Sequence, residues 1–351
     1  MIAIQSTKTL NFISLLLLSA VLTGGCRTAQ RAADPAANAR ANGILEYMRG
    51  RESSQKKRII SGQFDNFGSR ANLHLLNRVH ESTGHWPALV GVDYADEGGI
   101  NWRAPNKAAI EYWNAGGLVT VSTHLYNPCR TNEYGGLRDK GVDLNALLVE
   151  GSDTHGRWMR ELDRVADGLQ QLKDAGVVVL WRPFHEMNGD WFWWGAKDPA
   201  LFIQLWRQMF QYYTKTRHLD NLLWVYSPNH GDKTAAYYPG DEYVDLIGLD
   251  AYTDYIETNH IKGYPEMARI KKPFGFTEFG PHSPSNPPGD YDYRRFLKGV
   301  QQDFPRTVFF MSWNAKWSLA SNTNVAEFLS SPSIVNREDL PKGIAGPHES
   351  R

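Results

Sequence analysis

The chain has 351 residues, and its 38 Lys and Arg residues balance 38 Asp and Glu residues, so its formal net charge is zero. This balance argues against a nucleic-acid-binding protein, which normally carries a basic excess. Two cysteines are too few for a disulfide-stapled scaffold, and a hydrophobic content of 42% excludes a mainly disordered chain. The 12 Trp, 16 Tyr and 15 Phe suit either a packed core or a surface for a flat ligand.

Residues 1–26 have the features of an export signal. Lys8 precedes an apolar run over residues 10–22, which at about 13 residues is too short to span a bilayer core. The run leads into the sequence LTGGC, which is similar to a bacterial lipobox and ends at Cys26. We predict a lipoprotein signal with Cys26 lipidated, although Thr23 stands where a lipobox usually has leucine. An ordinary cleaved signal peptide is the alternative.

The signal is followed by a predicted tether and one folded domain. Residues 27–42 are rich in Ala, Arg and Asn and predict the tether, and residues 43–345 form the domain. We expect a monomeric, exported lipoprotein in the bacterial cell envelope, anchored on the periplasmic side or at the outer membrane. No acidic run follows Cys26, which favours the periplasm-facing anchor. The lipid would be the only membrane contact, and Cys129 is expected to be a free thiol.

Eight β-type runs follow in the domain. They cover residues 58–63, 88–93, 118–123, 177–182, 222–227, 244–250, 273–278 and 307–313. Most are continuous apolar stretches, typical of parallel strands buried on both faces. Eight strand–helix units in about 290 residues predict a single (β/α)₈ TIM barrel of the α/β class rather than a doubly wound sheet.

Two of the intervening helices have clear signals. Asp198 is a candidate cap before Pro199, and apolar residues at helical spacing continue over residues 201–213. A second apolar periodicity covers residues 159–172 and stops at Gly176, before the fourth strand. The first strand is followed by neither a dinucleotide-binding nor a P-loop glycine motif, so we expect no cofactor.

The chemistry of such a barrel lies at the carboxyl ends of its strands. The polar and aromatic residues found there are Asp65, Asn66, Asp93, Tyr94, His124, Arg182, His185, Glu186, Asn229, His230, Asp250, Tyr252, Glu278 and Trp313. Glu186 and Glu278 follow the fourth and seventh strands, which face each other across the barrel. Two carboxylates that flank one bond are what glycosidic cleavage needs, so the pattern predicts a glycosidase.

Two loops at this end are unusual. Trp191 to Trp194 read WFWW directly after Glu186, and such apolar crowding in a loop is typical of a ligand surface. For Trp193 and Trp194 two interpretations stay open: a rim for extra sugar units, or packing under the loop. Residues 126–156 far exceed the roughly two to six residues of an ordinary barrel loop and predict a lid or wall beside the cleft.

Two motifs carry a specific resemblance. Residues 181–191, WRPFHEMNGDW, resemble the acid/base motif of glycoside hydrolase family 26, the β-mannanases, and residues 276–280, FTEFG, are similar to its nucleophile motif. His185 resembles family 26 in particular, since most of this retaining clan of (β/α)₈ glycosidases has Asn before the acid/base Glu. The resemblance covers roughly residues 40–340. It implies that Glu186 is the acid/base and that Glu278 is the nucleophile.

The resemblance also implies a substrate-binding set around the two glutamates: His124, Arg182, His185, Trp191, Asp250, Tyr252 and Trp313. Arg182 and Tyr252 would hold Glu278 ionised and aimed, and the two histidines would bind the sugar in the cleavage subsite. Trp313 would lie beneath the distorted sugar and Trp191 on the leaving-group side.

Simpler alternatives exist for several of these residues. Asp250 would orient either Tyr252 or a sugar hydroxyl. His124 and Trp313 also suit a plain core, and the two glutamates could be structural partners of Arg182. No metal site is expected, because the His-Glu pair lacks the second His of H-E-x-x-H.

The expected function is endo-acting hydrolysis of β-1,4-mannan, galactomannan or glucomannan with retention of configuration, releasing mannobiose and short manno-oligosaccharides. An exo-type, mannobiose-releasing mannanase is one alternative, and a family member acting on xylan or mixed-linkage β-glucan is another. A non-catalytic glycan-binding lipoprotein is a third, against which the two intact glutamates argue. A neutral polysaccharide gains nothing from electrostatic steering, which fits the zero net charge.

Overall fold

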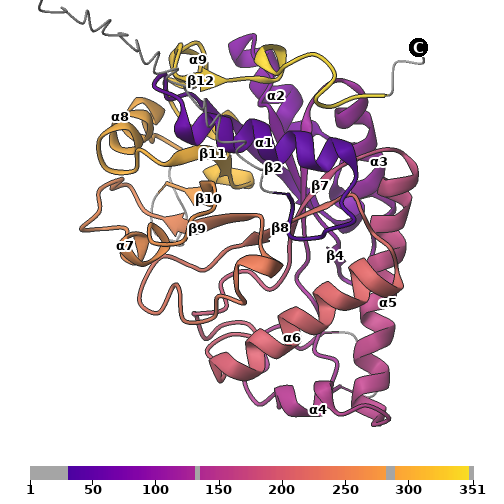
Figure 1. Ribbon diagram of the computed structural model, residues 1–351. Helices are drawn as coiled ribbons and strands as arrows, with labels where there is room; N and C mark the ends of the chain where they lie inside the picture. Colours follow the sequence, from indigo (N-terminus) through magenta and orange to yellow (C-terminus); the bar gives the residue numbers. More distant parts are fainter. Residues whose placement is uncertain (1–30, 131–134, 282–288, 348–351) are drawn as a thin grey trace, which may run out of the picture. The chain divides into compact units, whose positions relative to one another are not determined.

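Eight parallel strands close into a barrel in the computed structural model, which describes residues 31–130, 135–281 and 289–347 (Figure 1). In chain order the barrel strands are β2 (Gly62–Phe67), β3 (Leu89–Asp93), β6 (Leu118–Ser122), β7 (Val179–Arg182), β8 (Leu222–Tyr226), β9 (Leu246–Tyr252), β10 (Phe274–Gly280) and β11 (Thr307–Ser312). The pairings of β10 with β11 and of β11 with β2 close the ring. The predicted (β/α)₈ barrel is confirmed, and every predicted run overlaps one barrel strand.

Short strands and helices complete the fold. The additional strands are β1 (Ile59–Ile60), β4 (Ala95–Asp96), β5 (Gly99–Ile100) and β12 (Ile334–Val335). The α-helices are α1 (Ala39–Ser53), α2 (His74–Thr83), α3 (Arg103–Asn114), α4 (Leu144–Leu148), α5 (Asp153–Asp174), α6 (Pro199–Gln211), α7 (Tyr264–Met267), α8 (Tyr293–Asp303) and α9 (Val325–Leu329). Single turns of 3₁₀-helix lie at Gly68–Arg70, Asp241–Tyr243, Ala315–Trp317, Leu319–Ser321 and Arg337–Asp339, and a π turn at Tyr212–Thr216.

The two helices with the clearest sequence signals form for the expected reasons. The Asp198 side chain caps α6 by accepting from the backbone N–H groups of Ala200 and Leu201, and Pro199 occupies the first turn. The α5 helix ends before Gly176, whose φ of +72° suits the left-handed turn after a helix. Both helices bury an apolar stripe against the barrel.

The folded domain begins earlier than the sequence indicated. Residues 31–42 are packed: Ala32 is buried, the Ala33 N–H donates to Asp245 Oδ1 at 2.6 Å, and α1 starts at Ala39 behind an Asn38 cap. The predicted boundary at residue 43 therefore falls inside α1, and the tether prediction is wrong for residues 31–42. Residues 1–30, with the predicted signal and Cys26, lie outside the described residues. Within the described part of the chain, no helix is both long and apolar enough to cross a bilayer.

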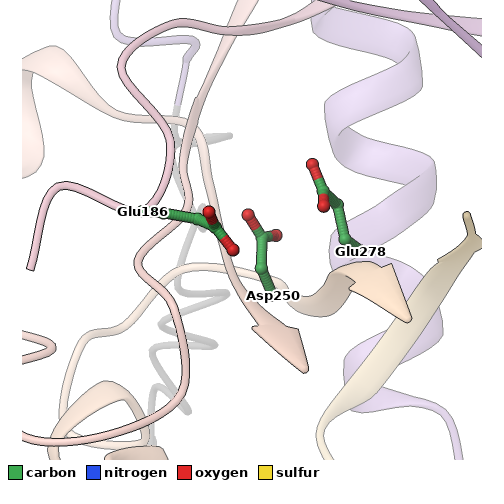
Figure 2. Close-up of side chains that lie close together, drawn as sticks. All are labelled: Glu186, Asp250 and Glu278. Atoms are coloured by element: carbon green, nitrogen blue, oxygen red, sulfur yellow. The ribbon is translucent and has the colours of Figure 1, made fainter. Parts of the chain in front are cut away.

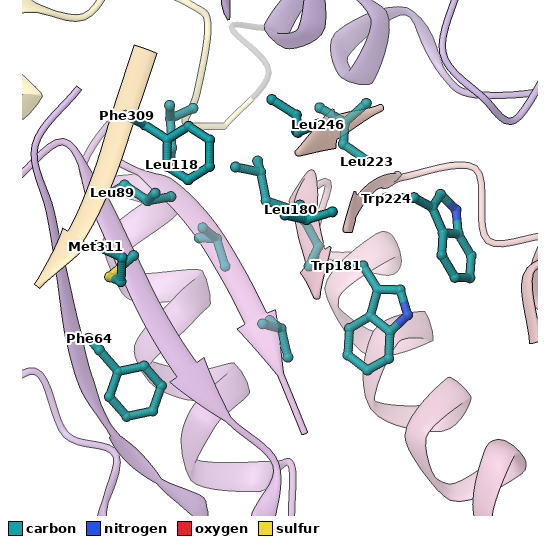
Figure 3. Close-up of a cluster of buried hydrophobic side chains, with 14 of the residues drawn as sticks. Phe64, Leu89, Leu118, Leu180, Trp181, Leu223, Trp224, Leu246, Phe309 and Met311 are labelled. Carbon is teal, nitrogen blue, oxygen red and sulfur yellow. The ribbon is translucent and has the colours of Figure 1, made fainter. Parts of the chain in front are cut away.

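The barrel core is filled by large apolar side chains, part of which Figure 3 shows. Figure 3 labels Phe64, Leu89, Leu118, Leu180, Trp181, Leu223, Trp224, Leu246, Phe309 and Met311. Where two strands approach closely, only glycine fits. A Cβ atom on Gly248 of β9 would lie 2.5 Å from Thr277 Cγ2 and 2.7 Å from the backbone oxygen of Gly275 in β10.

Gly248→Ala is therefore expected to destabilise the fold by about 1–3 kcal/mol, because a backbone oxygen cannot move aside as a side chain can. Activity should fall as well, since the displaced Thr277 precedes Glu278. Gly43→Ala is the matched control: it lies within α1 with no atom near the new Cβ and should stabilise the protein by roughly 0.5–1 kcal/mol. Urea unfolding of both variants measures the two opposite shifts, and equal midpoints would contradict this account.

Candidate active site

Glu186 follows β7 in a segment of turns. Phe184 and Glu186 have φ angles of +48° and +57°, in the left-handed region that costs a non-glycine residue roughly 1–3 kcal/mol. Two backbone hydrogen bonds hold the turn: the Glu186 N–H donates to Ser227 O at 2.7 Å, and the Gly189 N–H donates to Glu186 O at 3.0 Å. The backbone of Glu186 is therefore fixed to the carboxyl end of β8.

Glu278 lies in β10 next to an irregularity of the sheet. The register of β10 against β9 shifts between Phe276 and Glu278, and its register against β11 shifts over the same stretch. Such bulges turn a side chain away from strict alternation. Arg182 Nη2 donates to Glu278 Oε1, and the Tyr252 hydroxyl donates to Glu278 Oε2 at 2.7 Å. Both oxygens of Glu278 are thus held in place, one by Arg182 from β7 across the barrel and the other by Tyr252 from the neighbouring strand β9.

Three carboxyl groups converge at this end of the barrel. Figure 2 shows Glu186, Asp250 and Glu278 together, and one oxygen atom of each lies within 4.8 Å of the others. Arg182 Nη1 donates to Asp250 Oδ2 at 2.9 Å, and the Ser227 hydroxyl donates to Asp250 Oδ1 at 2.8 Å. Asp250 therefore contacts Arg182, whereas the Tyr252 hydroxyl contacts Glu278; orientation of Tyr252 is not the role that these contacts give Asp250.

One guanidinium serves two of the three carboxyl groups. Arg182 lies where a cation would be needed between Asp250 and Glu278, so these side chains already have their counter-charge. Within the described residues, Glu186 has no ion pair; its Oε2 accepts a hydrogen bond from Trp191 Nε1 at 2.6 Å. Glu186 is consequently the carboxyl of the three that is best suited to carry a proton.

The pKa of Glu186 is raised well above its ordinary value. Burial is the largest cause, and the neighbouring charges of Glu278 and Asp250 add to it; the hydrogen bond from Trp191 opposes the shift. A carboxyl group that keeps its proton near neutrality is what a general acid requires. The two glutamates therefore differ: Glu186 has the raised pKa that suits a general acid, whereas Glu278 is paired with Arg182.

The histidines and Trp313 lie around an aromatic wall beside these carboxyl groups. His124 Nε2 lies 3.1 Å from His185 Nε2, and His185 is buried whereas His124 is partly exposed. Trp313 stacks on Phe64 at 4.0 Å between ring centroids and meets the edge of Phe67 at 5.8 Å. The Phe67 ring also lies 5.4 Å from the His124 ring, so Phe67 contacts both of these predicted sugar-binding residues, His124 and Trp313.

Comparison with known families decides the assignment. Residues 33–339 match glycosyl hydrolase family 26. The chain belongs to this family. It is therefore a glycoside hydrolase, and the resemblance carried by residues 181–191 and 276–280 is confirmed for the whole domain.

Several family members are similar over most of the chain. Mannan endo-1,4-β-mannosidase A and B of Caldalkalibacillus mannanilyticus is 35% identical over 339 residues, which cover 90% of this chain and 64% of that protein. A mannan endo-1,4-β-mannosidase of Bacillus subtilis is 35% identical over 333 residues, covering 88% and 89%. This chain thus spans less than two thirds of the first relative and most of the second.

Solved structures agree with this grouping. A mannanase of Bacillus subtilis superposes with a TM-score of 0.84 at 32% identity, covering 91% of this chain and 98% of that chain. A β-mannanase from a symbiotic protist of the termite Reticulitermes speratus was solved with a gluco-manno-oligosaccharide. It superposes with a TM-score of 0.73 at 26% identity, covering 90% and 98%.

The tryptophan cluster of this family 26 enzyme divides into one site residue and two packing residues. Trp191 contacts Glu186, but Trp193 and Trp194 are fully buried. Their indole N–H groups donate to the backbone oxygens of Leu125 and His185, both at 2.8 Å. Of the two interpretations left open, packing under the loop is correct for Trp193 and Trp194.

The long loop after β6 packs against the segment that carries Trp191. The backbone N–H of Trp193 donates to Leu137 O at 2.9 Å. Lys197 Nζ donates to Lys140 O at 2.6 Å and to Val142 O at 2.9 Å. The α4 helix of this loop contacts α5 and α6 (Figure 1). The described part of the loop therefore supports the wall of the site; residues 131–134 lie outside the described residues. Cys129, half-buried in it, has a free thiol.

Trp191→Phe removes the N–H that stabilises ionised Glu186, so the pKa of Glu186 is expected to rise further. Activity that needs the protonated acid is lost as pH rises through that pKa, and the basic limb of the profile of kcat/KM against pH should move to higher pH. Trp193→Phe is the matched control, because it loses an indole hydrogen bond to the backbone without touching Glu186. An unmoved or lowered basic limb in Trp191→Phe contradicts the assignment.

Sequence reasoning gave no role to two residues of this site. Phe67 ends β2 and contacts both His124 and Trp313, and Asp93 ends β3 and accepts from His124. Position at a strand end was the available signal for both. Asp93 was named among the strand-end residues without a role, and Phe67 was not named, because the contacts of both depend on strand register.

Proposed function

We propose that this protein is an endo-acting β-1,4-mannanase that cleaves mannan, galactomannan or glucomannan with retention of configuration, releasing mannobiose and short manno-oligosaccharides. The observation that carries the proposal is the pair Glu186 and Glu278, with oxygens within 4.8 Å of each other. Retaining glycosidases separate their carboxyl groups by roughly 5–5.5 Å, whereas inverting enzymes leave roughly 6.5–9.5 Å for a water molecule. The short separation supports retention.

The proposed reaction proceeds in two displacements. Glu278 attacks the anomeric carbon while Glu186 gives its proton to the departing glycosidic oxygen, leaving a glycosyl ester on Glu278. Glu186, now ionised, then takes a proton from water, whose oxygen attacks the anomeric carbon and breaks the ester bond. Arg182 and Tyr252 hold the Glu278 carboxylate throughout, and Glu186 ends protonated, ready for the next cycle.

The substrate class rests on the relatives and on the aromatic side chains of the site. The relatives named above are mannan endo-1,4-β-mannosidases, and the protist enzyme was solved with a gluco-manno-oligosaccharide. Trp313 and Phe67 offer apolar surface to the C–H face of a sugar, while His124 offers a polar contact. No cofactor takes part in the proposed reaction.

Two measurements on the purified protein test the proposal. Proton NMR of the first sugar released from mannohexaose should show the β-anomer; the α-anomer would mean inversion and reject the mechanism. Product lengths from mannan should range over several oligosaccharides, whereas mannobiose alone from the start would mean exo-type release. Equal or faster hydrolysis of xylan or mixed-linkage β-glucan would reject mannan as the substrate.

We further propose that the protein is exported as a lipoprotein anchored through Cys26 and acts as a monomer. The supporting feature is the apolar run that ends in LTGGC. Cells that express the wild type should incorporate labelled palmitate into the protein, and Cys26→Ser should not. Equal labelling of both, or labelling of neither, rejects the anchor.

A further inference from the structure

Asp93 is a fully buried carboxylate at the end of β3 that the proposed mechanism does not use. Its Oδ2 accepts from the Ser122 hydroxyl at 2.6 Å and lies 2.9 Å from His124 Nδ1. Its Oδ1 accepts from the backbone N–H groups of Ala95, at 2.8 Å, and His124, at 3.2 Å. Four donors thus surround a group that, when ionised, only accepts hydrogen bonds.

These contacts determine the protonation state of Asp93. Burial alone would raise the pKa of Asp93, but His124, Ser122 and the backbone outweigh it and lower the pKa, so the group is ionised near neutrality. A carboxylate oxygen cannot donate, and therefore His124 Nδ1 must carry the hydrogen of this contact. The second nitrogen of His124, Nε2, faces His185 Nε2 at 3.1 Å.

His185 determines which nitrogen donates in that second contact. Burial, and then the charge of Arg182, lower the pKa of His185 well below its ordinary value, so the ring is neutral with one N–H. Its Nδ1 is buried without a hydrogen-bond partner among the described residues. An unpaired buried lone pair is better tolerated than an unpaired N–H, so the hydrogen of His185 lies on Nε2 and points to His124.

We propose that Asp93 is a positioning residue that sets the direction of a hydrogen-bond chain in which His185 Nε2–H donates to His124 Nε2 and His124 Nδ1–H donates to Asp93. The chain connects the carboxyl end of β3 to the residue preceding Glu186. Because Nδ1–H is committed to Asp93 and the single Nε2 lone pair accepts from His185, His124 can accept from a sugar hydroxyl only at Nε2 and only in place of His185. This inference rests on the proposed function for its consequence in catalysis: a substrate hydroxyl that takes the place of His185 can bind His124 Nε2 only as a hydrogen-bond donor.

Asp93→Asn should reverse this chain. An amide has one accepting oxygen, and the two backbone N–H groups of Ala95 and His124 cannot turn away from it, whereas the Ser122 hydroxyl can rotate and His124 can change tautomer. The amide NH₂ then faces His124 Nδ1, which becomes the acceptor. The hydrogen of His124 moves to Nε2, and His185 must accept with Nε2 and carry its hydrogen on the unpartnered Nδ1.

Nitrogen-15 NMR of the histidine rings tests the inference at neutral pH. His124 is identified by the signals that disappear in His124→Gln. In the wild type His124 should show a protonated Nδ1 and a bare Nε2, and in Asp93→Asn the two should exchange. A wild-type His124 protonated at Nε2, or an unchanged tautomer in Asp93→Asn, overturns the inference. The wild-type spectrum decides alone if the variant does not fold.

Kinetics provide the second measurement. Asp93→Asn should lower kcat/KM on mannohexaose by about tenfold or more, as expected for the loss of a transition-state hydrogen bond. Asp96→Asn is the matched control: it makes the same change three residues along the chain, in β4, at a carboxylate that accepts from the Ser69 backbone N–H and the Asn101 side chain. It should leave both the His124 tautomer and kcat/KM unchanged. The NMR readout needs no substrate, so it decides on Asp93 even if mannan hydrolysis is not found.

Discussion

Glu278→Gln is expected to lower kcat for mannan hydrolysis by roughly 10⁴-fold or more, because no other group can form the bond to the anomeric carbon. Glu186→Ala should lower it by roughly 10²–10⁴-fold, the usual contribution of a general acid. The fold should survive both changes, since Arg182 keeps Asp250 as a partner and Glu186 forms no ion pair among the described residues.

The two variants should differ in how they are rescued. An aryl mannoside with a good leaving group needs no acid, so Glu186→Ala should still form the glycosyl-enzyme, and azide should then release a β-mannosyl azide. Glu278→Gln should remain inactive on the same substrate. Asp190→Asn is the matched control, because this carboxylate lies in the same loop as Glu186, is 68% exposed and pairs with the exposed Lys140. Equal rescue of both variants would contradict the assignment of roles.

Arg182→Met is expected to destabilise the protein by about 3–5 kcal/mol and to remove activity, because it leaves Asp250 and Glu278 buried without a cation. Burial and the charge of Glu278 already raise the pKa of Asp250, and Arg182 opposes them. Loss of Arg182 should raise this pKa further. A carboxyl group whose pKa is raised in the folded state favours folding at low pH and loses that contribution as pH rises through the raised pKa.

The penalty of Arg182→Met should therefore be smaller at pH 5 than at pH 8, as measured by urea unfolding at the two values. Arg217→Met is the matched control. Arg217 also pairs with two carboxylates, Asp163 and Asp167, but its side chain is 23% exposed, and its loss should cost about 1 kcal/mol or less at either pH. A penalty of Arg182→Met that is equal at both pH values would show that lost packing, rather than unpaired charge, dominates.

The barrel and the positions of its key side chains could be predicted because they depend on local patterns. Strands buried on both faces are continuous apolar runs, and topology then places their following residues at one end of the barrel. Glu186 and Glu278 follow from this rule without any knowledge of contacts. The helix α6 was equally predictable, because Asp198 and Pro199 form its start in consecutive positions.

Other features depend on contacts between distant segments and could not be read from the sequence. The hydrogen bonds of Asp93 join residues 29 and 31 positions apart, and they require the register of β3 against β6. The segment 31–42 has the composition of a linker, yet it packs because Asp245, far along the chain, accepts from Ala33. Burial of Trp193 and Trp194 likewise depends on Leu125 and His185.

The left-handed backbone at Glu186 has an energetic cost that the rest of the fold has to offset. Glycine adopts a φ of +57° without steric cost, whereas glutamate does not. The packing of the rest of the domain must supply the free energy that offsets this steric cost, and the large aromatic core contributes to it. On the proposed function, the site therefore gives up some stability in order to place the carboxyl group of Glu186 beside Glu278.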